Sequence, residues 1–223
     1  GCGPMNEPVA SDSPARRTRG RPRKTADERD DGNRRQELLR AAARLFRQQG
    51  FAATSTRDIA TAAGMRSGSP FYHFENKEAL LAAVMLEGMQ RATSCQSGAM
   101  QAAASPGIAL SARDCLRVLV RNHLEVLLGP DSDFIPVMLY EWRSLSEVQR
   151  QAVNELRREY EAVWVPVLQA LHERGELQGD PSLARLMMFG ALNWAVQWFE
   201  PGRRSSLDDL TEAALRLFLK EIQ

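Results

Sequence analysis

Cysteine is scarce and scattered in this sequence. Cys2, Cys95 and Cys115 are the three cysteines among 223 residues, and none forms a CxxC pair or stands near a histidine at metal-ligand spacing. An odd number of isolated thiols argues against both a disulfide framework and a zinc site. We therefore expect free thiols, no metal and no cofactor. The four residues before Met5 are set aside, because Met5 suits a native start.

Long apolar runs are also missing. No uninterrupted stretch approaches the ~20 apolar residues of a membrane span. The first thirty residues carry charges and prolines where a signal peptide would need an apolar segment. Hydrophobic residues make up 43% and charged residues 26%, as in ordinary globular proteins. These features predict a folded cytoplasmic protein without a membrane partner.

Catalytic motifs are absent as well. The three histidines, His73, His123 and His172, lie far apart, and the chain contains no HExxH, GxSxG or phosphate-binding glycine loop. Nucleophilic and metal-assisted catalysis both need such constellations. We therefore do not expect an enzyme.

What the sequence does contain is an uneven distribution of charge. The net charge is only +1, but residues 1–80 hold 15 Lys and Arg against 10 Asp and Glu, and residues 81–223 hold 14 against 18. Six of the basic residues fall between Arg16 and Lys24 without an acid among them. This asymmetry predicts a nucleic-acid-binding end on a neutral to acidic body.

The basic segment lies in a region rich in Pro, Gly and Ser, so residues 1–30 are expected to form a disordered arm. Its core resembles the AT-hook, in which arginines reach into the narrow minor groove of DNA. The alternative is a cationic tail that touches only phosphates. Both interpretations place the same residues on DNA: Arg19, Arg21, Arg23 and Lys24.

The rest of the chain predicts an all-α fold. Alanine and leucine far outnumber valine and isoleucine, and no stretch alternates apolar and polar residues for long. A first helix is expected over 33–49, with an apolar stripe, and it should end at Gly50. Ser55 and Asp58 form a capping-box pattern for a short second helix. Gly64 suits a turn, and a third helix should follow over 67–73, with Pro70 in its first turn.

This helix, turn and helix arrangement over residues 31–80 is typical of a DNA-binding domain. The segment Leu38 to Val84, LLRAAARLFRQQGFAATSTRDIATAAGMRSGSPFYHFENKEALLAAV, resembles the TetR family of bacterial transcriptional regulators. The resemblance implies backbone contacts from the start of the second helix and a recognition helix that follows it. The residues so implied are Thr54, Ser55, Thr56 and Arg57, then Ser67, Gly68, Ser69, Phe71, Tyr72 and His73, and Lys77 as a phosphate ligand.

Phe71 and Arg66 differ from the other residues of this region. Phe71 stands where the family usually has Tyr, so a hydroxyl contact to phosphate must be absent or made by Tyr72. Arg66, in the turn, has the bidentate capacity to read guanine. The alternative interpretation of the aromatic residues Phe71, Tyr72 and Phe74 is that they only anchor the core.

Residues 81–223 are expected to form a helical domain for ligand binding and dimerisation. Helices are predicted over 76–94, 111–128, 132–145, 146–174, 181–199 and from 206 onward, with a loop over 97–111 and a kink at Pro166. The helix over 181–199 is apolar nearly all round, which predicts burial against a second subunit. The last helix adds one apolar stripe to the expected homodimer interface: Leu207, Leu210, Ala214, Leu217 and Phe218. In the family such helices form a four-helix interface, which would bind a palindromic operator on double-stranded DNA.

Polar residues in the helix over 181–199 suggest a ligand wall. Asn193 and Gln197 are four residues apart, and Gly190 leaves space beneath Asn193. The alternative is that these amides bond across the dimer or to a neighbouring helix. Together with Trp194, Trp198, Tyr140 and Arg143, the pattern loosely resembles a branch of the family that answers to acyl-CoA thioesters. Trp164 is included in the candidate ligand site, and Arg143 or Arg121 could meet an anionic group.

The sequence therefore predicts a homodimeric, ligand-responsive transcriptional regulator. We expect a repressor released by a small hydrophobic effector, for which the resemblance suggests an acyl-CoA. The competing interpretation is an architectural or activator-type DNA-binding protein without a small-molecule effector. A purely architectural protein would not need the residues after the first domain.

Overall fold

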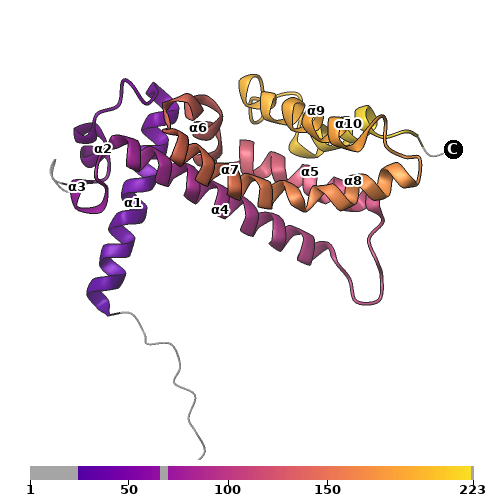
Figure 1. Ribbon diagram of the computed structural model, residues 1–223, viewed down its shortest axis with the longest axis horizontal. Coiled ribbons are helices and arrows are strands. Elements are labelled where there is room, and N and C mark those ends of the chain that lie inside the picture. Colours follow the sequence, from indigo (N-terminus) through magenta and orange to yellow (C-terminus); the bar gives the residue numbers. More distant parts are fainter. Residues whose placement is uncertain (1–24, 66–69, 222–223) are drawn as a thin grey trace, which may run out of the picture.

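The computed structural model describes residues 25–65 and 70–221, and for Pro70 and Phe71 only the backbone (Figure 1). In this part of the chain the regular structure is helical, apart from two isolated bridges, Ser105 with Ile108 and Leu177 with Leu219. The all-α prediction is confirmed. The arm residues Arg19, Arg21, Arg23 and Lys24 and the turn residues Arg66, Ser67, Gly68 and Ser69 lie outside the described residues.

The helices divide into a head and a body. The head contains α1 (Ala26–Gln49), α2 (Thr56–Ala62) and α3 (Pro70–His73). The body contains α4 (Lys77–Ala103), α5 (Ala112–Leu128), α6 (Phe134–Glu141), the 3-10 turn η1 (Trp142–Ser144), α7 (Glu147–Ala162), α8 (Trp164–Glu173), α9 (Pro181–Trp194), the 3-10 turn η2 (Ala195–Gln197) and α10 (Leu207–Phe218).

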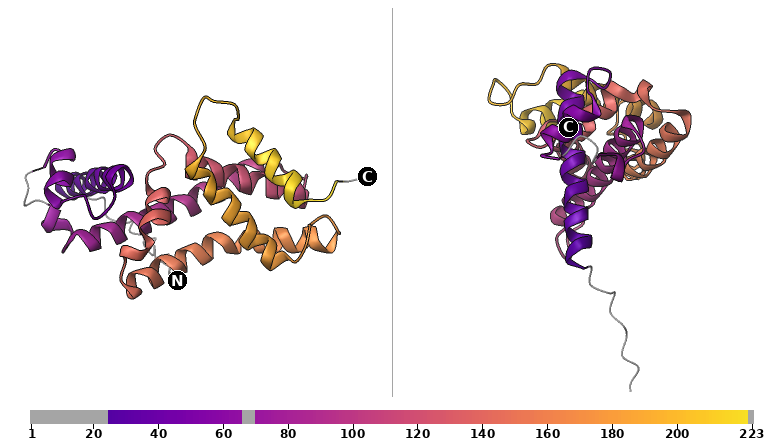
Figure 2. Two further views of the ribbon diagram at one scale, coloured as in Figure 1. Left: turned by 90° about the horizontal axis from the view of Figure 1, so that it is seen from above. Right: turned by 90° about the vertical axis from the view of Figure 1, so that its left-hand side faces the viewer.

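Helix α1 begins seven residues earlier than predicted. Thr25 is its N-cap and forms a capping box with Glu28, whose carboxylate accepts the Thr25 amide at 2.9 Å. Asp27 and Glu28 also place negative charge at the positive end of the helix dipole. The prediction of a disordered arm extending to residue 30 is therefore wrong for residues 25–30. The first turns of α1 project away from the body (Figures 1 and 2).

Helix α4 is longer than predicted and is the central helix of the body. It continues through Gly98 to Ala103, so residues 97–103 are helical and not part of a loop. A glycine inside a helix costs only about 1 kcal/mol. That cost is offset by packing, because α4 lies against α5, α6 and α7 and, in the head, against α1. Buried Gln96 also donates from Nε2 to the Tyr160 carbonyl at 3.0 Å.

The expected long helix over 146–174 is divided in two. Ser146 caps α7 through a capping box with Gln149, as predicted, but α7 ends at Ala162 and α8 starts at Trp164. Pro166 has no amide hydrogen for the Ala162 carbonyl, and its ring would crowd that carbonyl. Helix α7 therefore ends four residues before the proline, whereas a kink at Pro166 itself was expected.

Helices α9 and α10 lie across one side of the body. In Figure 1 they form a layer above α5, α7 and α8, and Figure 2 shows that layer from above. The Ser111, Asp180 and Ser206 caps are confirmed, each accepting a backbone amide at the start of its helix. Helix α9 stops at Trp194 and continues as η2, so it is shorter than the predicted 181–199. No helix in the described part of the chain has the length and apolar character to cross a membrane.

Candidate DNA-binding head and effector cavity

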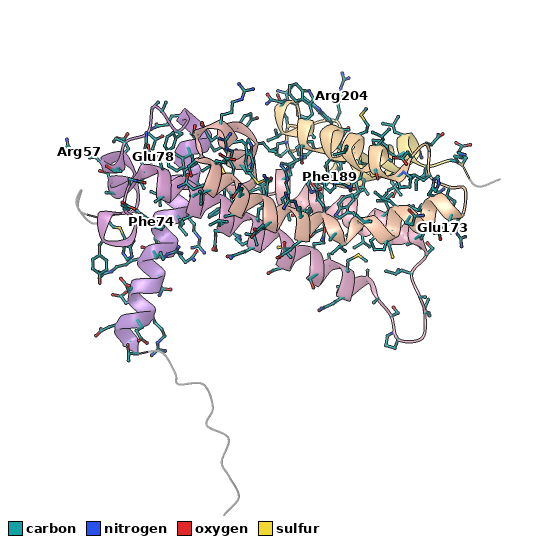
Figure 3. The ribbon with its side chains drawn as sticks, in the orientation of Figure 1. Arg57, Phe74, Glu78, Glu173, Phe189 and Arg204 are labelled. Carbon is teal, nitrogen blue, oxygen red and sulfur yellow. The ribbon has the colours of Figure 1, made fainter. Side chains whose placement is uncertain are left out.

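The start of α2 has the predicted local structure. Ser55 is the N-cap: its hydroxyl accepts the Asp58 amide at 3.0 Å, and the Asp58 carboxylate accepts the Ser55 amide at 3.0 Å. These bonds from Ser55 lower the pKa of Asp58. Arg57 is exposed and points away from the head (Figure 3). The free amide hydrogens of this helix end and the Arg57 guanidinium can both meet a phosphate.

Thr54 does not have the predicted exposure. Its side chain is buried, and Oγ1 donates to the Gly50 carbonyl at 2.7 Å. The hydroxyl therefore closes the turn between α1 and α2. The implied DNA contact from the Thr54 side chain is wrong, because a short side chain held in that bond cannot reach a ligand outside. Thr56, at the first position of α2, is half-buried.

The two described side chains of the recognition helix differ in exposure. Tyr72 is 81% exposed, and its ring stands perpendicular to the His73 ring at a centroid distance of 5.1 Å. The His73 side chain is largely covered, and its Nε2 lies 3.8 Å from Oδ1 of Asp31 on α1. Phe74 is buried, so it is a core anchor. Tyr72 is thus the described residue of α3 that is free to touch DNA.

Lys77, the first residue of α4, is bonded to the head. Its Nζ donates to the Phe51 carbonyl at 2.8 Å and lies 4.1 Å from the centre of the Phe51 ring. Asn76 caps α4 by accepting the Ala79 amide at 2.8 Å, which places Lys77 at the first position of the helix. The ammonium therefore joins the start of α4 to the turn after α1. A phosphate contact from Lys77 would have to share or replace that bond.

A small cavity lies inside the body, between α4, α5, α6, α7 and α9. Its free volume is about 30 Å³ and its walls are mainly apolar, with one polar side near the His123 ring and with Arg157 and Glu161 of α7 also at the wall. The lining residues are Met89, Ala92, His123, Val126, Ile135, Met138, Arg157, Tyr160, Glu161, Phe189 and Asn193. Phe189 points from α9 into the space between the layers (Figure 3). An effector of ordinary size would have to push these walls apart.

The polar side of this cavity is a chain of three side chains. His123 Nδ1 lies 2.8 Å from the Tyr160 hydroxyl, and His123 Nε2 lies 2.8 Å from Oδ1 of Asn193. The amide oxygen can only accept, so Nε2 carries the hydrogen and Nδ1 accepts from the tyrosine. Burial lowers the pKa of His123 to about 4, against the opposing effect of the Asn193 bond. Burial also raises the pKa of Tyr160. All three of these side chains are therefore uncharged at neutral pH.

A second buried hydrogen bond, between Trp164 and Gln96, lies close to the His123 side chain. Trp164 donates from Nε1 to Oε1 of Gln96 at 2.7 Å, and its ring lies 4.6 Å from that of Phe189. Trp164 is fully buried. It was predicted as a ligand contact, but it lies behind Phe189 and outside the cavity wall.

Several predicted ligand residues lie elsewhere. Gln197 does not share a face with Asn193, because η2 interrupts the helix, and its Nε2 donates to the exposed Tyr140 hydroxyl at 3.0 Å. Arg143 is exposed, and Arg121 is held by Glu125 and Asp208 at 2.6 and 2.7 Å. None of these side chains lines the cavity.

Gly190, Trp194 and Trp198 also face outward. Gly190 is exposed and a Cβ placed on it would meet nothing within 4 Å, so this glycine faces open space outside the body and does not line the cavity. Trp194 is 65% and Trp198 56% exposed. The expectation that these three residues form the ligand wall is wrong. Asn193 does line the cavity, and its amide bonds to the neighbouring helix α5, as the alternative interpretation held.

Sequence reasoning missed His123 and Tyr160. His123 lies on the apolar stripe of α5, beside Leu119, Val120 and Leu127, all buried. A lone histidine among buried leucines was a usable signal, since a polar ring there needs a partner. Its partners come from residues 37 and 70 positions away, which no local pattern reveals.

The outer face of α9 and α10 carries exposed apolar side chains. Leu183, Leu186 and Met187 are about two-thirds exposed on α9, and Leu217 is 74% exposed on α10. A groove of about 340 Å³ runs between the two helices, and Leu210, Ala214, Leu217, Phe218 and Trp198 are among its lining residues. We call this surface the α9/α10 face. Apolar patches of this kind mark association surfaces.

These features define a class of protein: a helix-turn-helix head that can present α2 and α3 to DNA, on a helical body with an internal cavity. Residues 38–84 match the family model described as bacterial regulatory proteins, tetR family, and residues 109–222 match the model described as tetracyclin repressor-like, C-terminal domain. The chain belongs to the TetR family of bacterial regulatory proteins and is a DNA-binding transcriptional regulator.

Comparisons with individual proteins agree with this family assignment. The HTH-type transcriptional repressor KstR2 of Rhodococcus jostii is 30% identical over 195 residues, which cover 83% of this chain and 89% of that protein. The crystal structure of the protein described as superantigen PfiT is 36% identical, with a TM-score of 0.70, over 85% of this chain and 97% of its own. AibR in complex with isovaleryl coenzyme A and operator DNA has a TM-score of 0.73 at 24% identity, over 82% and 97% of the two chains, and shows the shared fold.

Proposed function

We propose that the protein is a homodimeric transcriptional repressor that leaves its operator when an acyl-CoA thioester enters the body. The observation that carries the effector half of this proposal is the cavity itself, which has apolar walls and an uncharged polar end at His123 and Asn193. An acyl chain suits the walls. A thioester carbonyl or a chain hydroxyl suits the hydrogen-bonding end at His123 and Asn193, where the neighbouring side chains carry no charge.

Relatives support the same effector class. The fatty acid metabolism regulator protein of Bacillus subtilis is 25% identical over 83% of this chain. The structure of AibR with isovaleryl coenzyme A is a precedent for an acyl-CoA in this fold. The free volume of about 30 Å³ means that the cavity must widen on binding, which gives the ligand a structural change to act through.

On the DNA side, the proposal assigns contacts to the exposed residues at the start of α2 and on α3. Ser55, Thr56 and Arg57 would meet the backbone, and Tyr72 would offer a hydroxyl to phosphate. Arg66, Ser67, Gly68, Ser69 and Phe71 remain candidates for the same interface on the sequence resemblance alone, as do the arm residues Arg19, Arg21, Arg23 and Lys24. His73 and Lys77 would act mainly by holding the head together.

The α9/α10 face is proposed as the homodimer interface. Leu217 and Trp198 stand exposed on it, whereas Leu207, Leu210, Ala214 and Phe218 are half-buried and pack partly on the core. A two-fold axis through this face would give two heads for a palindromic operator.

One experiment tests the effector half. The purified protein would be screened with CoA thioesters of increasing acyl length, measuring both the melting temperature and the release of operator DNA. A binding thioester should raise the melting temperature and weaken operator binding by about 10- to 100-fold, which needs ~1.4 to 2.8 kcal/mol of coupling. If operator binding is sequence-specific but no thioester alters either quantity, the regulator responds to a different ligand or to none.

A further inference from the structure

Three hollows follow one another from the effector cavity to the surface beside α1. The cavity shares Val126 and Ile135 with a second hollow of about 150 Å³. The second hollow shares Arg91, Asp131 and Phe134 with a third of about 470 Å³, which reaches α1. The shared residues separate neighbouring hollows that lead toward the DNA-binding head, so a ligand too long for the cavity would extend in that direction once these walls move apart.

The outermost hollow is lined by three arginines. Arg40 and Arg44 lie one turn apart on α1, so they share one face of that helix, and Arg91 reaches the hollow from α4. Within the described residues, none of the three forms an ion pair. The Arg91 guanidinium instead lies 5.3 Å from the centre of the Phe134 ring. We call these three residues the junction arginines.

The acids of this hollow do not neutralise the junction arginines. Asp133 is already paired with Arg47 at 3.0 Å, and the same guanidinium nitrogen donates to the Ser132 carbonyl at 3.2 Å. Asp131 is the remaining carboxylate, so three cations face one uncommitted anion. This excess favours a bound anion, and guanidinium groups match phosphate oxygens with paired hydrogen bonds.

We propose that the junction arginines bind the phosphate-bearing end of the effector. This inference rests on the proposed function: with the acyl part in the cavity, the pantetheine of an acyl-CoA would follow the middle hollow and its 3′-phospho-ADP would reach Arg40, Arg44 and Arg91. Two of these residues belong to the head and one to the body. The phosphates would therefore hold the head and body in one relative arrangement, and the ligand would act on DNA binding from both ends.

The test compares two ligands that share an acyl group. Calorimetry would measure decanoyl-CoA and S-decanoyl-pantetheine, which lacks the phosphates, against the unmodified protein and the variant Arg40→Gln/Arg44→Gln/Arg91→Gln. The triple variant should bind decanoyl-CoA at least about tenfold more weakly, while its affinity for decanoyl-pantetheine stays the same. A control with the same reduction of charge on other exposed or half-buried arginines, Arg150→Gln/Arg158→Gln/Arg204→Gln, should bind both ligands as the unmodified protein does.

Other outcomes separate this inference from the proposed function. If decanoyl-pantetheine binds the unmodified protein as tightly as decanoyl-CoA, the junction arginines do not bind the phosphates, and the acyl effector stands without them. If the triple variant loses operator affinity without ligand, these arginines serve DNA and the inference is wrong. If neither acyl compound binds, the proposed effector fails, and 3′-phospho-ADP alone then decides: binding that the triple variant abolishes supports the anion site, and no binding refutes it.

Discussion

The backbone amide of Phe51 donates to Oε1 of Glu141 across 3.0 Å. Phe51 lies in the turn after α1, in the head, and Glu141 is the last residue of α6, ninety positions later. At the other end of α6, Asp133 pairs with Arg47 of α1 at 3.0 Å. Helix α6 is therefore attached to the head at both ends.

The same helix forms part of the cavity wall, through Ile135 and Met138. A ligand that widens the cavity must move this wall, and the two attachments would carry that movement to the head. The junction between α7 and α8 at Val163 lies at the end of α7 that is farther from α6 (Figure 1).

Replacing Glu141 by Ala should uncouple ligand binding from DNA release. The variant has no acceptor for the Phe51 amide, so acyl-CoA should still bind while its effect on operator affinity falls from about 10- to 100-fold to a few-fold. Fluorescence anisotropy with labelled operator, with and without ligand, measures this ratio. Glu141→Gln keeps an oxygen acceptor and should retain most of the coupling. Full release in the Ala variant would show that α6 is not the link.

Tyr72 should contribute to operator affinity through its hydroxyl. Because the side chain is 81% exposed, Tyr72→Phe and Tyr72→Ala should both leave the melting temperature unchanged. Removing one phosphate hydrogen bond should weaken operator binding by about five- to tenfold in the Phe variant. Equal affinities for the unmodified protein and both variants would remove Tyr72 from the interface.

The basic arm should give operator binding much of its salt dependence. Deleting residues 5–24 should lower affinity and reduce the slope of log K against log salt by ~0.9 for each phosphate that the arm neutralises in the unmodified protein. The described head begins at Thr25, so its capping box with Glu28 stays intact in the shortened protein. An unaltered slope would mean that the arm does not touch DNA.

The local parts of the head could be predicted from sequence because their signals are local. Ser55 with Asp58, and Gly64 at φ +69°, follow from capping and turn chemistry over a few residues. The equally local Thr25 with Glu28 box was present but was obscured by the polar, charged residues that follow it. Helix ends set by packing, such as the extension of α4 past Gly98, were not predictable in this way.

The body shows the limit of periodicity more clearly. The helix over 181–199 reads as apolar on every side. In the protomer, however, α9 is buried at Met188 and Phe189, whereas Leu186 and Met187 are exposed. The sequence alone could not say which side faced the cavity. Trp194 was therefore assigned to the ligand although it lies on the outside. Lys77 is a similar case, since its bond to Phe51 crosses 26 residues.

Leu217→Glu should disrupt the homodimer without unfolding the protomer. Leu217 is 74% exposed on the α9/α10 face, so a carboxylate is hydrated in the monomer and becomes costly only when a second subunit covers it. Sedimentation velocity should show monomers at concentrations where the unmodified protein is dimeric, with an unchanged helical circular dichroism spectrum. Val148→Glu, at a 76% exposed site on α7, is the matched control and should remain dimeric. A dimeric Leu217 variant would move the interface elsewhere.

The buried His123 should make the protein sensitive to acid over a defined pH range. Its pKa is about 4 in the folded protein against 6.5 when unfolded, so between these values the unfolded chain binds a proton that the folded chain does not. The free energy of unfolding therefore keeps the whole contribution of the neutral His123 above pH 6.5. It decreases as the pH falls toward 4, by about 3 kcal/mol in total at ~1.4 kcal/mol per pH unit. Urea unfolding at fixed protein concentration measures this decrease. His123→Gln should be less stable at neutral pH, because the bonds to Tyr160 and Asn193 are disturbed, but its stability should fall less steeply below pH 6.5. Parallel pH profiles for the two proteins would show that His123 is not the residue that titrates.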